Sequence, residues 1–240
     1  MIEVGRVHEL ARYPVKSMAG TTTTSAFLGW HGLDGDRRFA FRRVGADGGM
    51  PWLTAGRLPE LLLYHPVVDE SGDPTHVRTP AGACLELRSA ELATELAGRF
   101  GGAVELMKLN HGIFDEATIS VISLTTIEGI GREAGLELDR RRFRANIVLE
   151  TEHGETFLED EWVGGTLLFG DGDPRPAVSV TLRDERCVMI NLDPETAEQD
   201  ARVMKTAVRL NKNTAGVYGT VVRTGTIRVG DRVSLMPCGS

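Results

Sequence analysis

The sequence predicts a mainly β protein with a few helices (an α+β fold), arranged as two barrel-like domains. Three observations support this prediction. Short apolar and β-branched segments recur along the chain, and frequent turn signals separate them; the 240 residues include 28 Gly and 10 Pro. There is also no regular alternation of strands and helices, no Gly-x-Gly-x-x-Gly after a strand and no Walker A loop. Many short strands with glycine turns favour barrels or sandwiches over a nucleotide-binding Rossmann or P-loop fold.

The first part of the chain is expected to be mostly strands. The apolar pattern predicts them at residues 4–12, 21–28, 36–44, 61–68 and 84–87. Pro14 cannot donate to a ladder, so Lys16 and Ser17 are expected at a strand end or in a loop.

Two helices carry recognisable end signals. Residues 89–100 are predicted to be helical, because Ser89 can cap the first turn and Gly101 follows the last. Leu92 and Leu96 fall on one face of that helix. A second short helix is predicted at residues 126–134, with Gly135 at its C-terminal end.

The second part of the chain again reads as β. Strands are predicted at residues 118–124, 143–149, 162–169, 177–182, 215–222 and 226–235, with an apolar run at 188–192. Residues 196–213 are expected to form a surface helix or an extended excursion. Turn-forming residues at 110–112 indicate a domain boundary near this point. We therefore predict two domains, at residues 1–108 and 109–240.

Composition excludes several classes of function. A formal net charge of −7 argues against a general nucleic-acid binder, which needs a basic face. No segment approaches the roughly 20 apolar residues of a membrane span, and no secretory signal opens the chain. The three cysteines, Cys84, Cys187 and Cys238, share no Cys-x-x-Cys spacing, which argues against a disulfide framework or a cysteine-rich metal site. A soluble protein of the reducing cytoplasm is expected.

The most informative residue is Cys187, which follows Arg186. A thiol is a soft ligand, suited to a metal or to carrying sulfur. Arg144 and Asn146 lie about forty residues earlier on a predicted strand, where residues two apart share a face and would suit an anionic, hydrogen-bonding cofactor. The alternative is that Cys187 is a small buried apolar residue.

Several short motifs, in this order and spacing, resemble the MOSC family, which is named for the C-terminal domain of molybdenum cofactor sulfurase. The first part of the chain resembles the β-barrel domain that precedes MOSC in many members. The matching stretches are residues 13–17 (YPVKS), 35–39 (GDRRF), 53–61 (LTAGRLPEL), 123–126 (SLTT), 142–148 (RFRANIV), 157–162 (FLEDEW), 186–187 (RC) and 225–231 (GTIRVGD).

The resemblance implies a molybdenum enzyme similar to the mitochondrial amidoxime reducing component and its bacterial relatives. In those proteins a molybdopterin-type cofactor and one cysteine hold the metal, and N-hydroxylated small molecules are reduced. Carried over, the molybdenum ligand and catalytic centre is Cys187, and Arg186 beside it would favour the thiolate. Because no iron–sulfur extension is recognised, electrons would come from a separate ferredoxin-, flavoprotein- or cytochrome-type protein.

The resemblance also assigns residues to the cofactor and substrate. Lys16, Ser17 and Arg37 would line the pocket; Arg144 would hold phosphate, and Asn146 would bond the pterin edge. The remaining assignments are Ser123, Thr125 and Arg186 at the cofactor, and Asp160 with Trp162 at the open side of the metal, Asp160 being the second catalytic candidate.

Departures from the family pattern keep other functions open. Ala145 stands where members often have proline, and residues 183–187 (RDERC) are acidic where enzymatic members often carry a second cysteine. One alternative is a sulfur-carrier or cofactor-carrier module that uses Cys187 without turnover. A lower alternative is a pyridoxal-phosphate site with Lys16 as the Schiff-base lysine. The last is a plain β-barrel binding module.

Overall fold

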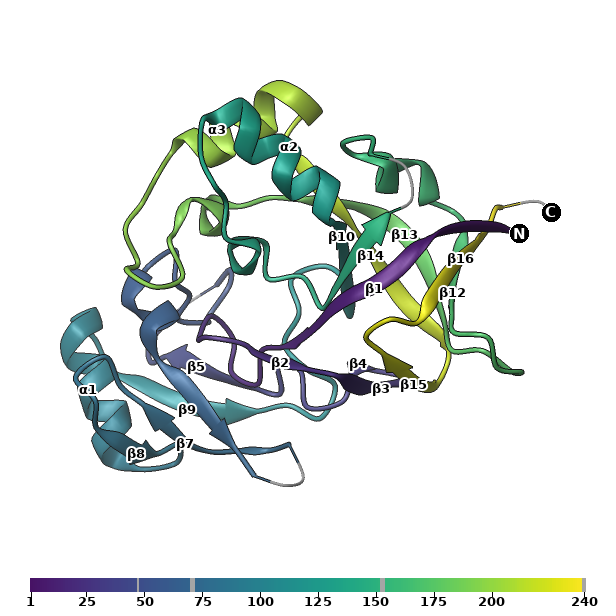
Figure 1. Cartoon of the computed structure of the whole chain (residues 1–240). Helices are drawn as coiled ribbons and strands as arrows, with labels where there is room; N and C mark the ends of the chain where they lie inside the picture. Colours follow the sequence, from purple (N-terminus) through teal and green to yellow (C-terminus); the bar gives the residue numbers. More distant parts are fainter. Residues whose placement is uncertain (47, 70–71, 152–153, 239–240) are drawn as a thin grey trace.

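A closed β-barrel is the centre of the structure, which is a computed structural model describing residues 1–46, 48–69, 72–151 and 154–238. Seven strands close it, because β1 pairs with β11 on one side and with β16 on the other (Figure 1). In order around the barrel they are β1 (Ile2–Arg12), β11 (Ile147–Thr151), β10 (Ile119–Ser123), β14 (Thr214–Arg223), β13 (Ala177–Glu185), β12 (Thr166–Phe169) and β16 (Arg232–Met236). The short β2 (Thr21–Thr23) extends this sheet from β1. The predicted mainly β class with a few helices is confirmed.

Three smaller sheets complete the strands of the described residues. One joins β15 (Gly225–Arg228), β3 (Ser25–Gly29) and β4 (Gly32–Leu33), so the two ends of the chain meet there as well. The others are β5 (Phe39–Arg43) with β9 (Val104–Lys108), and β6 (His65–Val68), β7 (Pro74–Arg78) and β8 (Cys84–Glu86). The predicted boundary at residues 108/109 stays a prediction, although β1 and β3 pair with strands from the second part of the chain.

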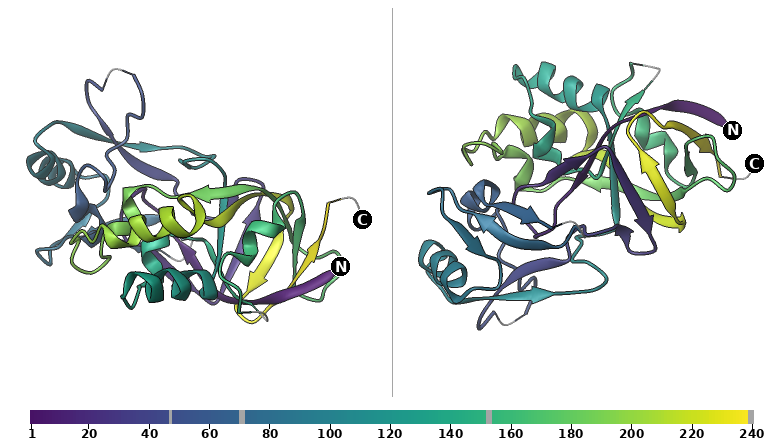
Figure 2. Two further views of the ribbon diagram at one scale, coloured as in Figure 1. Left: turned by 90° about the horizontal axis from the view of Figure 1, so that it is seen from above. Right: turned by 60° about the horizontal axis from the view of Figure 1, so that its bottom comes forward.

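Helices cover two separate faces. α1 (Ala90–Phe100) packs on β8 and β9, at the end of the molecule opposite the two termini (Figure 2). α2 (Leu124–Ala134) and α3 (Arg202–Asn211) pack on each other beside β11 and β14. Four short 3₁₀ helices lie at Pro59–Leu63, Arg140–Phe143, Leu158–Trp162 and Val188–Asn191. No helix of the described ranges is both long and apolar enough to cross a membrane.

The end signals of α1 and α2 act as predicted. The Ser89 hydroxyl accepts the Leu92 amide at the start of α1, and Gly101 ends that helix in the left-handed conformation. Ser123 caps α2, which therefore begins two residues earlier than predicted, and Gly135 ends it. The predicted strand at residues 143–149 is wrong at its start, since a 3₁₀ helix ends at Phe143 and the strand begins at Ile147.

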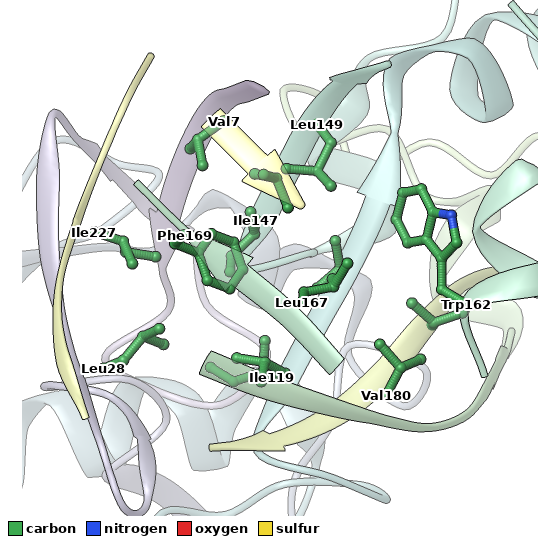
Figure 3. Close-up of a cluster of buried hydrophobic side chains, with 14 of the residues drawn as sticks. Val7, Leu28, Ile119, Ile147, Leu149, Trp162, Leu167, Phe169, Val180 and Ile227 are labelled. Carbon is green, nitrogen blue, oxygen red and sulfur yellow. The ribbon is translucent and has the colours of Figure 1, made fainter. Parts of the chain in front are cut away.

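Three clusters of buried apolar side chains hold the fold. One fills the barrel and includes Trp162 and Phe169 (Figure 3). A second lies under α1 and the small sheets, and a third lies between α2, α3 and the outside of the barrel. The segment after Cys187 joins two of them, because Ile190 packs in the third cluster and Leu192 in the second. That segment is therefore fixed from both sides.

Barrel closure requires a glycine at residue 5. Gly5 has φ +145, and a Cβ there would lie 2.1 Å from the Glu150 carbonyl oxygen of β11. We expect Gly5→Ala to lower the free energy of unfolding by more than about 2 kcal/mol, because β1 must move away from its partner. Gly45→Ala is the matched control, since Gly45 has φ +73 with no atom within 4 Å and should cost only about 1 kcal/mol. Urea unfolding followed by circular dichroism measures both; equal losses would contradict the account.

Candidate functional site

A cavity of about 740 Å³ brings together side chains from both parts of the chain. Its wall is built from segments distant in sequence: the loop after β1, the residues before β5, the loop at 50–56, the segment before β10, the end of β13 and part of β14. Six of the predicted site residues line it together: Lys16, Ser17, Arg37, Arg144, Arg186 and Cys187.

Cys187 is exposed on the cavity wall. It occupies the position before the 3₁₀ helix Val188–Asn191, and the apolar anchors Ile190 and Leu192 fix the chain that follows it. The interpretation of Cys187 as a buried apolar residue is therefore wrong. Cys84 lies on β8, within the predicted strand at residues 84–87, and is also exposed.

Arg186 holds the chain on the other side of Cys187. Its guanidinium is buried and donates from Nε to the Ala215 carbonyl (2.6 Å) and from Nη1 to the Phe143 carbonyl (2.8 Å). Its backbone is bonded in both directions to Asn213, through Arg186 N–H to the Asn213 carbonyl and Asn213 Nδ2 to the Arg186 carbonyl. Most hydrogen-bond donors of Arg186 are therefore bonded within the protein. These bonds fix the backbone next to Cys187.

Lys16 is a buried cation in the same wall. Its Nζ lies 2.8 Å from the exposed Asp115 carboxylate and 3.3 Å from the Ile113 carbonyl oxygen. Burial lowers the pKa of Lys16, and the attraction of Asp115 only partly offsets this. A buried ammonium with one exposed counter-ion can take an anionic ligand in its place.

Arg37 is oriented by a fully buried carboxylate. Asp36 accepts from Arg37 Nη1, from the Tyr13 amide (2.7 Å) and from Asn146 Nδ2 (3.0 Å). Burial alone would lower the pKa of Arg37, but the Asp36 carboxylate outweighs it and the pKa is raised. The predicted role of Asn146 as a pterin contact stays a prediction.

Asn146 is not on a strand facing the ligand, and it does not line the cavity. Its Nδ2 donates to Asp36 and to the Ala11 carbonyl, and its Oδ1 accepts the Ser120 amide. Those bonds use both donors and one acceptor position of the Asn146 side chain, which therefore links Asp36 to β10.

Arg144 also lies outside a strand. It follows the 3₁₀ helix, in the left-handed conformation.

Arg144 is a guanidinium without a carboxylate partner among the described residues. Nη1 donates to the Met18 carbonyl oxygen (2.8 Å), whereas Nη2 is buried and has no hydrogen-bond partner. Its guanidinium lies 4.2 Å from the centre of the Tyr13 ring, which also carries Arg37 at 4.8 Å. Burial lowers the pKa of Arg144 to about 10. An unpaired, desolvated cation of this kind is suited to an anionic ligand.

Three residues of the cavity wall have a strained backbone conformation. Ser17 (φ 65), Arg37 (φ 48) and Arg144 (φ 50) are non-glycine residues in the left-handed region, and all three line the cavity. Such conformations persist only where surrounding contacts hold them, and they cluster at functional sites.

The sequence did not identify a second polar group in the cavity wall. Asp184 is buried, accepts from Ser120 Oγ (2.8 Å) and from the Tyr218 hydroxyl, and lies 3.0 Å from Arg186 Nη2. Burial raises the pKa of Asp184 against the opposing effect of Arg186. The sequence did contain a signal for Asp184, because the acidic residues before Cys187 (RDERC, residues 183–187) depart from the family pattern. The positions of Ser120 and Tyr218, on β10 and β14, carried no such signal.

Ser123 and Thr125 lie outside the cavity lining, next to a different group. Their hydroxyls lie 3.0 Å apart, and Ser123 Oγ donates to the buried Glu159 carboxylate (2.9 Å). Thr126 Oγ1 donates to the same carboxylate oxygen (3.0 Å). In this structure these residues join α2 to the 3₁₀ helix Leu158–Trp162 rather than face the cavity.

Asp160 and Trp162 are also outside the lining. Trp162 is in the barrel core, so its placement at the open side of the metal is wrong (Figure 3). Asp160 accepts from Asn211 Nδ2 (2.7 Å) and lies 3.4 Å from Arg183 Nη1. Since Arg183 lines the cavity, Asp160 is linked to the cavity wall through this ion pair.

Comparison with known proteins identifies two family regions. Residues 108–234 match the MOSC domain, and residues 4–101 match the MOSC N-terminal beta barrel domain. No curated protein matches the chain.

Three solved structures are similar to this chain. The YuaD protein from Bacillus subtilis has 14% identity, with 97% of this chain and 95% of that chain covered and a TM-score of 0.54. YiiM from Geobacillus stearothermophilus has 16% identity, with 50% and 54% covered and a TM-score of 0.35. A hypothetical protein has 10% identity, with 98% and 68% covered and a TM-score of 0.46. At these identities the likeness to YuaD shows the fold alone.

Glu159 should make stability depend on pH. Burial raises the pKa of its carboxyl above the ordinary value, against hydrogen bonds from Ser123 and Thr126. The native state then binds more protons than the unfolded state, so stability is greatest below the unfolded pKa and is lost as pH rises through the folded pKa. We expect the stability of the wild type relative to Glu159→Gln to fall as pH rises through that window. Denaturant unfolding at a series of pH values gives the free energy of unfolding as a function of pH for each protein, with Glu161→Gln as the control. Parallel curves for the wild type and Glu159→Gln would contradict this role of Glu159.

Proposed function

Because the chain belongs to the MOSC family, we propose that its cavity binds a molybdenum cofactor and that Cys187 supplies the protein ligand to the metal. MOSC domains are associated with molybdenum cofactor sulfurases and oxidoreductase-type proteins. We further propose that the chain is an oxidoreductase that reduces N-hydroxylated small molecules with electrons from a separate redox protein.

The observation that carries this proposal is the pairing of an exposed thiol with unpaired positive charge in one cavity. Arg144 Nη2 is buried without a partner, and Cys187 is exposed on the same wall. The donor set fits the group: a phosphate ester suits a guanidinium, and molybdenum suits a thiolate.

The residues present divide the work of binding. Arg144 and Arg37 would grip the phosphate, Lys16 would add a point charge as the ligand displaces Asp115, and Ser17 would supply a hydroxyl. When bound, the cofactor supplies the two-electron chemistry. The protein holds the Cys187 thiol rigid between Arg186 and Ile190, and the Asp184–Tyr218 pair offers groups in the wall that can exchange a proton.

Metal content tests the proposal. Protein from a host that makes molybdenum cofactor should contain near-stoichiometric molybdenum and pterin, and Cys187→Ala should lose the metal or hold it loosely, because a ligand is gone. Cys84→Ala is the control, since this cysteine is exposed but lies outside the cavity. Elemental and pterin analysis measures both contents. No molybdenum in any variant would reject the enzyme; cyanide-releasable sulfur in its place would favour the sulfur carrier.

Arg144 should matter for cofactor retention more than its neighbours in the 3₁₀ helix. Arg144→Gln removes the charge that faces the phosphate and should weaken pterin binding by at least about tenfold, a charge-assisted hydrogen bond being worth 1.4 kcal/mol or more. Arg140→Gln is the matched control, because Arg140 pairs with Glu9 and does not line the cavity. Pterin retained after dialysis measures the difference. Equal retention in the two variants would remove Arg144 from the proposed site.

A further inference from the structure

Two histidine side chains meet on the surface, outside the cavity lining. His31 lies in the turn between β3 and β4, and His111 lies in the loop that follows β9, eighty residues later in the chain. The His111 Nδ1 atom is 3.2 Å from the His31 Nε2 atom, and both residues are exposed. Neither residue lines the main cavity, so the pair takes no part in the proposed function.

The two imidazole rings approach each other through these nitrogen atoms. The ring centroids are 4.4 Å apart, farther than the two nitrogen atoms, and the ring planes are inclined by 76°. Two neutral imidazoles hold such a contact as an N–H···N hydrogen bond, in which one ring donates and the other accepts. One proton then lies between two nitrogen atoms that are both able to bind a metal ion.

The spacing of the two nitrogen atoms suits a metal chelate. An imidazole nitrogen binds a transition metal at about 2.0–2.1 Å. Two such bonds to nitrogen atoms 3.2 Å apart enclose an angle of about 100° at the metal, between the angles of square-planar and tetrahedral coordination. The separation of the two nitrogen atoms therefore needs little change to hold one ion.

Backbone contacts hold the turn that carries His31. Gly32 has φ +98, and a Cβ there would lie 2.7 Å from the Thr118 carbonyl oxygen, so the turn packs directly on the segment before β10. The Asp34 amide donates to the Phe27 carbonyl oxygen (3.0 Å), which ties the end of the turn back to β3. The position of His31 is therefore set by the backbone around it.

The loop that carries His111 is fixed as well. On one side of this residue, the Leu109 amide donates to the Arg38 carbonyl oxygen (2.9 Å). On the other side, the Ile113 amide donates to the Arg37 carbonyl oxygen (2.8 Å). Both histidines thus stand on pre-formed backbone, and a ligand pair that is already in place binds an ion more tightly than two free imidazoles do.

We propose that His31 and His111 form a surface site for one divalent transition-metal ion of the copper, nickel or zinc class. The ion takes the place of the shared proton, which moves to the other ring nitrogen of the donating histidine. No group of three His, Cys, Asp or Glu in the described part of the chain is placed to hold a metal, so solvent fills the remaining coordination positions. Imidazole ligands favour these ions over Mg²⁺ and Ca²⁺, which prefer oxygen ligands.

Nickel titration of the full chain tests the site, with Trp30 as the reporter. Trp30 precedes His31 and is 66% exposed, so a paramagnetic Ni²⁺ ion bound at the pair should quench its fluorescence, whereas Mg²⁺ should not. His31→Ala and His111→Ala should each weaken Ni²⁺ binding by at least about tenfold, because one of two protein ligands is lost. His76→Ala is the matched control and should bind as the wild type does, since this histidine is exposed but contacts Thr75 rather than a second histidine.

Two results of the titration would overturn the site. Quenching that survives either substitution of the pair, or that is lost equally in His76→Ala, would show that the two histidines do not act together. Trp30→Phe should remove most of the saturable quenching. Quenching that stays as in the wild type would place the ion elsewhere.

A measurement on the wild type covers the case in which a variant does not fold. Zn²⁺ should shift the imidazole ¹⁵N resonances of His31 and His111 along one saturation curve, while those of His76 stay fixed. A shift at only one of the two histidines, or at neither, would overturn the pair. Neither measurement involves Cys187 or molybdenum, so this proposal and the proposed function can fail independently.

Discussion

The pairing of β1 with β11 and β16 is the interaction on which the rest of the structure depends. It closes the barrel and fixes the direction in which the chain leaves β1. The residues after β1 then carry Lys16 and Ser17 to the cavity wall. Asp36 adds a second connection, because its buried carboxylate joins the Tyr13 backbone, Arg37 and Asn146. These two connections tie the residues that carry Lys16 and Arg37 to the barrel strands.

The electrostatics of the cavity follow from unequal pairing of its cations. Arg37 and Arg186 have buried carboxylate partners, in Asp36 and Asp184. Lys16 has only the exposed Asp115, and Arg144 has no carboxylate in the described structure. An anionic ligand gains most from the cations that are least compensated, since the protein has already borne the cost of their desolvation. The Cys187 thiol lies on the same cavity wall, so one bound ligand could contact both the cations and the thiol.

The sequence predicted the class of fold and singled out six residues that line one cavity, for identifiable reasons. Ser89 and Gly101 marked α1 by local chemistry, and ordered motifs such as YPVKS and RFRAN brought Lys16 and Arg144 to attention. The sequence did not indicate which hydrogen bonds form between distant segments. Asn146 appeared free to meet a ligand, but Asp36 and the Ala11 carbonyl use its donors, and no spacing rule reports such partners. Trp162 packs in the apolar core of the barrel. The Ser123 hydroxyl donates to Glu159, which was not predicted as its partner.

The central claim is that the Cys187 sulfur is a ligand of the metal. X-ray absorption at the molybdenum edge, on protein purified from a cofactor-producing host, tests it most directly. Comparison of the wild type with Cys187→Ser keeps the size of the side chain and changes the ligand atom. The account predicts one fewer molybdenum–sulfur bond in the variant than in the wild type. Identical sulfur coordination in the two proteins would contradict it and would leave Cys187 as a thiol near the metal rather than bound to it.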